Sequence, residues 1–253
     1  MTPRLRGNQC AARLARHDII AGMDDPKIVL CGNDLVLSDF DATISAIDTG
    51  LAMFGALGDR AEDAWEMEHA WRRGEINSMD CLAGQWGLLD ISVDELYALI
   101  DSLKLDESFF DFLRLVRRRQ AGFAVVSDGL DFYVDRLLGA HGLKTSSDET
   151  QLRSPNHLVR LANHAIISED GLLIEFPYCN DCGQCGNCKA SDLFRLRQGF
   201  ARTIYIGDGH SDLCAARYAD IIFAKDALAE DCRRAGRRFH LFDRFTDIMK
   251  ILR

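Results

Sequence analysis

The hydrophobic positions of the chain fall into short runs that alternate with longer stretches of helical spacing. Short, mostly apolar runs predict buried strands at 35–39, 123–126, 203–206, 221–224 and 239–242. Apolar residues three and four positions apart predict helices at 132–141, 191–198, 213–219, 227–235 and 245–252. This alternation predicts an α/β fold with a doubly wound, parallel Rossmann-like sheet.

Turn residues and a long helical stretch complete the predicted organisation. Gly32-Asn33 lies between apolar runs at 27–31 and 35–39, and Glu169-Asp170-Gly171 lies between 165–168 and 172–176, so each is expected to close a β-hairpin. From 44 to 120 the pattern is helical throughout. We therefore predict three parts, which are an N-terminal tail at 1–26, a core domain at 27–45 and 121–253, and a small helical cap at 46–120.

Two carboxylates and a hydroxyl follow the first strand of the predicted core. They belong to the sequence Asp39-Phe40-Asp41-Ala42-Thr43. Both carboxylates can serve one site only if the strand ends at Asp39 and the backbone turns there, because strand alternation would separate them. Such a pair can bind Mg²⁺ through oxygen, and it can supply a nucleophile and a general acid–base. The alternative is a solvated Asp-rich loop.

Two further strands end in small or acidic residues. Ser127-Asp128-Gly129 follows one strand, and Gly207 to Asp212 follows the next, with Lys189 just before the intervening helix. An ordinary strand-to-helix turn would explain each segment separately. Ligands bind at the carboxyl ends of strands in open α/β sheets, so these groups converge if the strands are neighbours. The combination predicts a phosphate and metal site.

Composition narrows the class of protein. The chain has 253 residues, 47% of them hydrophobic, with a net charge of −9. The negative charge argues against a nucleic-acid-binding surface. The sequence has no apolar run of about 18 residues, the length that a membrane span requires. The first 25 residues are Arg-rich and lack the apolar segment of a secretory signal. The odd number of nine cysteines favours a reducing compartment, so we expect a cytoplasmic protein.

With these motifs in order, the sequence resembles the haloacid dehalogenase-like phosphatases over roughly residues 27–253. The family's four motifs are an Asp-x-Asp-x-Thr, a Ser or Thr after a strand, a Lys, and a Gly-Asp-x-x-x-Asp. They match Asp39 to Thr43, Ser127, Lys189, and Gly207 to Asp212. The resemblance implies a phosphoric monoester hydrolase that works through a phosphoaspartyl intermediate.

The resemblance also implies a role for each matched residue. It makes Asp39 the nucleophile and Asp41 the general acid and base. It places Mg²⁺ on Asp39, Asp208 and the backbone carbonyl of Asp41, with Asp212 in support. Substrate phosphate would be held by Ser127 and Lys189, with Thr43, Asp128 and Gly129 lining the same site. Mg²⁺ and Lys189 would then neutralise the charge of the transferred phosphoryl group.

The helical insert resembles the cap of the phosphoserine-phosphatase-like branch. Cys185-Gly-x-Cys-Lys189 resembles the methionine-salvage phosphatases that act on 2-hydroxy-3-keto-5-methylthiopentenyl-1-phosphate, whereas Gly207-Asp208-Gly209 is closer to phosphoserine and phosphoethanolamine/phosphocholine phosphatases. Ala42 and Asp128 depart from the pattern, since the family usually has Gly at the first position and the salvage enzymes tend to have Gly at the second. We expect a small phosphorylated metabolite as substrate, and the oligomeric state is not readable from the sequence.

Four cysteines are spaced regularly just before Lys189, at Cys179, Cys182, Cys185 and Cys188. Four thiolates at such spacing can close a structural Zn²⁺ site, which would stiffen the loop that presents Lys189. The alternatives are reduced thiols in a Gly-rich loop and, less in keeping with the spacing, an iron–sulfur cluster. The cysteine loop also allows an alternative function of a different class, in which the chain is a non-catalytic metal or redox sensor with a phosphatase-like fold.

Overall fold

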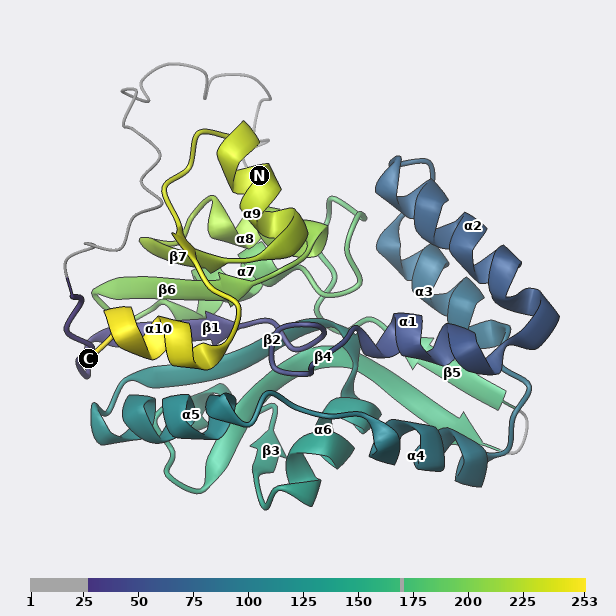
Figure 1. The fold of residues 1–253 in the computed structure, drawn as a ribbon, viewed down its shortest axis with the longest axis horizontal. Coiled ribbons are helices and arrows are strands. Elements are labelled where there is room, and N and C mark those ends of the chain that lie inside the picture. The colour runs from purple at the N-terminus through teal and green to yellow at the C-terminus, as the bar shows by residue number, and fades with distance from the viewer. Residues whose placement is uncertain (1–26, 169–170) are drawn as a thin grey trace, which may run out of the picture.

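The computed structural model describes residues 27–168 and 171–253. Its centre is an eight-stranded sheet in the order β3-β4-β2-β1-β6-β7-β8, with β5 paired to β4 (Figure 1). The strands are β1 Asp34–Ser38, β2 Gly122–Leu130, β3 Lys144–Ser146, β4 His157–Ser168, β5 Gly171–Glu175, β6 Arg202–Gly207, β7 Ile221–Ala224 and β8 His240–Leu241. Among these strands only the β4–β5 pair is antiparallel. The predicted doubly wound parallel α/β sheet is confirmed.

Helices connect the strands and cover the sheet. They are α1 Thr49–Met53, α2 Ala61–Arg72, α3 Ser78–Gly87, α4 Val93–Ser102, α5 Ser108–Arg118, α6 Asp131–Ala140, α7 Lys189–Leu196, α8 Leu213–Ala216, α9 Asp226–Arg234 and α10 Phe245–Ile251. Short 3₁₀ turns occupy Phe54–Ala56, Gly58–Arg60, Glu149–Gln151 and His210–Asp212. None of the helices in the described residues has the length and apolar character that a membrane span requires.

The alternation of side chains along β1 builds a core on each face of the sheet. Val36 packs into one buried cluster, which takes in residues of α5, α6 and α10. Leu35 and Leu37 point the other way into a second cluster, with residues of α7, α8 and α9. A central strand covered on both faces must be apolar at consecutive positions. This explains why β1 is fully buried. Because β1 is also the central strand in the sheet order, its carboxyl end lies at the middle of the sheet.

The helices after β1 divide between the cap and the core. In Figure 1, α2 and α3 stand away from α7–α9, and α3 contacts β5. In contrast, Phe109 and Phe112 of α5 pack against Phe123 of β2 and Phe245 of α10. Because α5 covers the sheet, we propose that α1–α3 form the cap proper. The boundary expected at residue 120 would then move to an earlier position.

The two predicted hairpins have different outcomes. The first is wrong, because Ile28 pairs with Leu252 near the C-terminus. The strand β1 has parallel neighbours, β2 and β6, on both edges and so has no free edge for an antiparallel partner. The second hairpin is confirmed by the pairing of β4 with β5. The predicted tail at 1–26 lies outside the described residues.

Candidate active site

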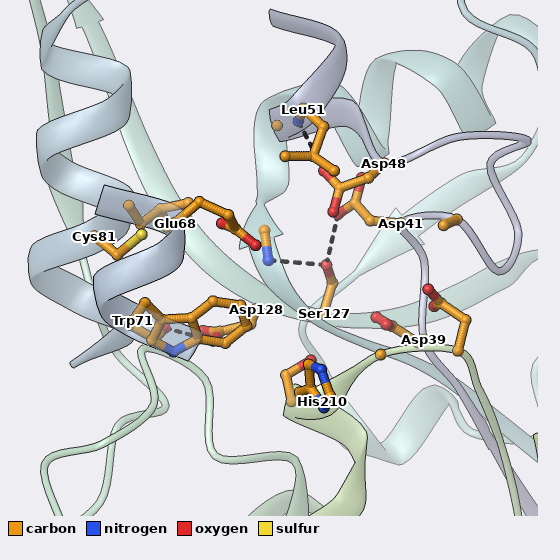
Figure 2. Close-up of a pocket in the computed structure, with 18 of the residues that line it drawn as sticks. Asp39, Asp41, Asp48, Leu51, Glu68, Trp71, Cys81, Ser127, Asp128 and His210 are labelled. Atoms are coloured by element: carbon orange, nitrogen blue, oxygen red, sulfur yellow. Dashed lines mark hydrogen bonds between the residues drawn. The ribbon is translucent and has the colours of Figure 1, made fainter. Parts of the chain in front are cut away.

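A pocket of about 510 Å³ opens where β1, β2 and β6 end, between the sheet and the cap (Figure 2). Most of the predicted site residues line it, namely Asp39, Asp41, Ser127, Asp128, Gly129, Lys189 and Asp208. Thr43 and Asp212 lie directly behind this wall, where Thr43 Oγ1 donates to Asp208 at 2.7 Å and Lys189 Nζ donates to Asp212 at 2.6 Å. The structure therefore brings the four separated segments to one point.

Asp39 stands immediately after β1 with its side chain largely buried. Its Oδ1 accepts a hydrogen bond from the Phe40 backbone N–H at 2.7 Å and pairs with Lys189 Nζ at 2.8 Å. These two contacts both fall on Oδ1, so neither of them engages Oδ2. Burial and then the nearby charge of Asp212 hold the pKa of Asp39 well above its usual range, although Lys189 opposes them.

Asp212 acts on the site through Lys189. Its Oδ1 accepts from Lys189 Nζ at 2.6 Å and from the Tyr205 hydroxyl at 2.7 Å. Its Oδ2 accepts from the backbone N–H groups of Asp208 and Gly209, both at 3.0 Å. Burial by itself would lower the pKa of Lys189, but Asp212 and Asp39 outweigh it and raise that pKa. The ammonium is therefore held charged and directed at Asp39.

The acidic side chains at this point suit a divalent cation. Among the described residues, the only group of three or more candidate metal-ligating side chains consists of Asp39, Asp208 and Asp212, whose oxygens lie within 4.8 Å of one another. Burial and the charge of Asp212 raise the pKa of Asp208 to about 7. Three carboxylates facing one ammonium leave excess negative charge, which an oxygen-preferring cation such as Mg²⁺ would compensate. Because Asp212 already accepts four hydrogen bonds, Asp39 and Asp208 are the side chains that fit the metal.

The turn after β1 brings Asp41 into the same pocket as Asp39. The strand ends at Ser38, and Ala42 adopts a left-handed conformation with φ of 52°. Asp41 Oδ2 accepts from the Tyr133 hydroxyl at 2.6 Å and from Ser127 Oγ at 3.3 Å (Figure 2 shows the Ser127 bond). Its Oδ1 accepts from the Thr49 backbone N–H at 3.0 Å. This is the turn that the spacing of the two carboxylates required.

Tyr133 is a site residue that the sequence analysis missed. It lies on α6, where the apolar pattern predicts only a helix face. A Cβ atom at Gly129 would lie 1.6 Å from the Tyr133 hydroxyl and 2.6 Å from Asp41 Oδ2. Gly129 therefore leaves room for the bond between Tyr133 and Asp41. The available signal was a tyrosine on a buried helix face, because its hydroxyl needs a polar partner.

The cap forms the opposite wall of the pocket. Asp48 accepts from the Leu51 backbone N–H at 2.9 Å, and burial together with the charge of Asp41 raises its pKa to about 7. Glu68 pairs with Arg72 at 2.8 Å. Trp71, Cys81, Leu82 and Trp86 add an apolar surface. The sequence analysis assigned none of these residues, because a helical pattern does not show which face meets a ligand.

The spacing of the four cysteines left a structural Zn²⁺ site and reduced thiols as alternatives. Cys179 and Cys182 are exposed, Cys185 is half-buried and Cys188 is buried. In the part of the chain that the structure describes, these thiols are not gathered as a group of metal ligands. Burial, with the charge of Asp128 next, raises the pKa of Cys185 to about 12, so this thiol stays protonated. No finding supports the Zn²⁺ site that the spacing suggested.

Comparisons with known proteins agree with this geometry. A family model described as Putative Phosphatase matches residues 34–228. A 2-hydroxy-3-keto-5-methylthiopentenyl-1-phosphate phosphatase of Bacillus velezensis is 29% identical over 220 residues, which cover 85% of this chain and 87% of that protein. The enzyme of the same name from Lysinibacillus sphaericus is 26% identical over 229 residues, covering 86% and 93%.

The fold has also been seen in solved structures. A phosphoserine phosphatase, described as a phospho-aspartyl intermediate analogue, superimposes with a TM-score of 0.64 at 18% identity. The match covers 87% of this chain and 98% of that structure. At this identity the likeness shows the fold alone. The match agrees with the predicted α/β fold and its mainly parallel sheet.

Proposed function

The chain belongs to the family described as Putative Phosphatase, and from this premise we propose that it is a Mg²⁺-dependent phosphomonoesterase of methionine salvage. The first candidate substrate is 2-hydroxy-3-keto-5-methylthiopentenyl-1-phosphate, the compound named in relatives that match most of the chain. One observation carries the proposal, which is the convergence of Asp39, Asp41, Ser127, Lys189 and Asp208 on a single pocket.

The geometry suits a transfer in two steps. Asp39 Oδ2 would attack phosphorus while the bond from phosphorus to the substrate oxygen breaks, and Asp41 would give its proton to that leaving oxygen. Asp41 would then take a proton from water as the water oxygen attacks the phosphoaspartyl group. Ser127 Oγ and Lys189 Nζ would hold the phosphoryl oxygens. Bound Mg²⁺ would supply charge neutralisation between Asp39 and Asp208.

The cap wall supports a small, partly apolar leaving group. The pocket volume of about 510 Å³ is in the range of small-molecule sites. Trp71, Leu82 and Trp86 offer the kind of surface that a methylthio group would contact. The free thiols of all eight described cysteines are in keeping with a reducing compartment, so we also propose a cytoplasmic location.

A second candidate rests on the carboxylates of the cap wall. Asp48 and Glu68 both line the pocket, and Glu68 is paired there with Arg72. Acidic side chains beside tryptophans favour a positively charged group. This observation keeps phosphoserine and phosphoethanolamine/phosphocholine as alternative substrates. The alternative of a non-catalytic sensor is weaker, because all the acid, base and phosphate-binding groups are in place.

The test is phosphate release from a panel that contains the salvage phosphate, phosphoserine, phosphoethanolamine and phosphocholine. We expect release with Mg²⁺ and none with EDTA, and we expect Asp39→Asn to lower kcat by about 10⁴-fold because the nucleophile is lost. Asp90→Asn is the matched control, since that carboxylate, in the segment between α3 and α4, is 88% exposed. Release that survives in Asp39→Asn would contradict the mechanism, and no release from any ester would overturn the assignment as an enzyme.

A further inference from the structure

Asp128 lines the pocket, but its carboxylate is occupied by other parts of the protein. Oδ1 accepts from the Asn187 backbone N–H at 2.7 Å and from Asn163 Nδ2 at 3.2 Å. Oδ2 accepts from Ser78 Oγ at 2.5 Å. These partners come from the cysteine loop, from β4 and from the first turn of α3 in the cap. One side chain of β2 thus joins three separate parts of the molecule.

Hydrogen bonds join the cysteine loop to the end of β2 through both the backbone and the side chain of Asn187. While Asp128 accepts from the Asn187 backbone, the Asn187 side chain donates to the Ser127 carbonyl at 3.0 Å and to the Leu161 carbonyl at 2.8 Å. Asn187 is 1% exposed and stands two residues before Lys189. This pairing therefore sets the distance between the two predicted phosphate-binding residues, Ser127 and Lys189. The positions of Ser127 and Lys189 can therefore depend on Asp128 although neither side chain bonds to its carboxylate.

The cap reaches the same point through Ser78. Its backbone N–H donates to the Gln184 carbonyl at 3.0 Å, and its Oγ accepts from the Gly186 N–H at 3.2 Å. A Cβ atom at Gly186 would lie 2.9 Å from both Asp128 Oδ1 and Asn163 Nδ2. The loop is therefore packed directly against the carboxylate. Ser78 is 6% exposed, so this contact between cap and core is shielded from water.

We propose that Asp128 is a positioning residue. Its hydrogen bonds to Ser78 and to Asn187 hold the cap against the loop segment that precedes Lys189. The proposal differs from the substrate contact expected for Asp128 from sequence, because the carboxylate acts through Asn187 and Ser78. Each contact has a separate consequence. Losing the Ser78 hydroxyl weakens the attachment of the cap, although the backbone bond from Ser78 to Gln184 remains. Losing the whole carboxylate also releases Asn187 and disturbs the phosphate site.

The experiment compares Asp128→Ala, Asp128→Asn and Ser78→Ala, with Ser102→Ala at the exposed end of α4 as the matched control. The proposal rests on the proposed function for its kinetic readout only, with p-nitrophenyl phosphate as the general ester. We expect Asp128→Ala to weaken competitive inhibition by inorganic phosphate about tenfold and to lower kcat/KM about 100-fold. Asp128→Asn should stay within about threefold, because its amide retains an acceptor for Asn187 and offers a donor to Ser78.

Ser78→Ala should raise the KM of the ester about tenfold while the inhibition constant of phosphate stays unchanged. It should also speed hydrogen exchange of amides in the first turn of α3. The proposal is overturned if Asp128→Ala lowers thermal stability but leaves KM, kcat and phosphate inhibition at wild-type values. It is equally overturned if Ser78→Ala behaves like Ser102→Ala.

A failure of the proposed function would be recognised separately. If the wild-type protein hydrolyses no ester, the two consequences are read from hydrogen exchange of α3 and of residues 185–189, and from calorimetric binding of inorganic phosphate. Unchanged exchange and unchanged binding in Asp128→Ala would then contradict the positioning role by themselves.

Discussion

The two walls of the pocket are built on different principles. On the core wall, Lys189 is 2% exposed and pairs with Asp39 and Asp212, and Asp212 accepts four hydrogen bonds. On the cap wall, Glu68 pairs with an Arg72 whose side chain is 45% exposed. Under the proposed function, the core wall is preorganised for one group, the phosphoryl oxygens. The cation of the cap wall, Arg72, is partly exposed, so it has more conformational freedom than the buried Lys189.

The largest test of this contrast is to remove one cation from each wall. Lys189→Met leaves two buried carboxylates without their partner, so we expect the free energy of unfolding to fall by about 3 kcal/mol and kcat/KM by about 10³-fold. Arg72→Met should cost less, about 1 kcal/mol, because the Arg72 side chain is 45% exposed and water screens its pairing with Glu68. Urea unfolding and steady-state kinetics measure both variants. Equal losses would show that the two walls are not distinct.

A smaller test concerns Asp48 and pH. Its folded pKa of about 7 lies above the ordinary value of 3.8, so the folded protein holds this proton more tightly than the unfolded chain. The associated stability is complete below pH 4 and is lost as pH rises through 7. Asp48→Asn keeps the N-cap of α1 and removes this loss. It should be more stable than wild type at pH 8, by on the order of 2 kcal/mol after allowance for solvent screening.

Urea unfolding at pH 4.5 and pH 8 without added metal checks this expectation. Asp94→Asn, an exposed carboxylate of α4, is the control. A variant that is no more stable than wild type at pH 8 would show that the Asp48 carboxylate carries no penalty of burial.

The smallest expected effect lies on the core wall, in the turn between its two carboxylates. Ala42 has a φ of 52°, a conformation that disfavours side chains with a Cβ atom. Glycine relieves this unfavourable conformation, but it also gains entropy in the unfolded chain, which offsets part of the relief. Ala42→Gly should therefore raise the free energy of unfolding by only about 0.5 kcal/mol. Ala46→Gly, in the exposed segment that follows, should lower stability instead. A loss of stability in Ala42→Gly would show that the turn carries no strain.

The sequence alone determined the core wall of the site. Asp39, Asp41, Ser127 and Asp208 follow short buried strands, and parallel strands place their carboxyl ends at one edge of the sheet. Local pattern was therefore enough to predict that these four residues would meet. Lys189 begins α7 instead, and its place beside them was expected from the family resemblance. The same reasoning failed for residues 27–31, because their partner, Leu252, lies at the other end of the chain.

Only the tertiary structure decided the rest of the site. Tyr133 and Asn187 act through contacts between segments that no local period links. The apolar stripe of α5 does not reveal that this helix packs on the sheet rather than in the cap. The spacing of the four cysteines suggested metal, yet the loop turns its polar groups toward Asp128 and Ser78. The physical reason is the same in each case, because helical and loop patterns specify which residues are buried but not against which partner.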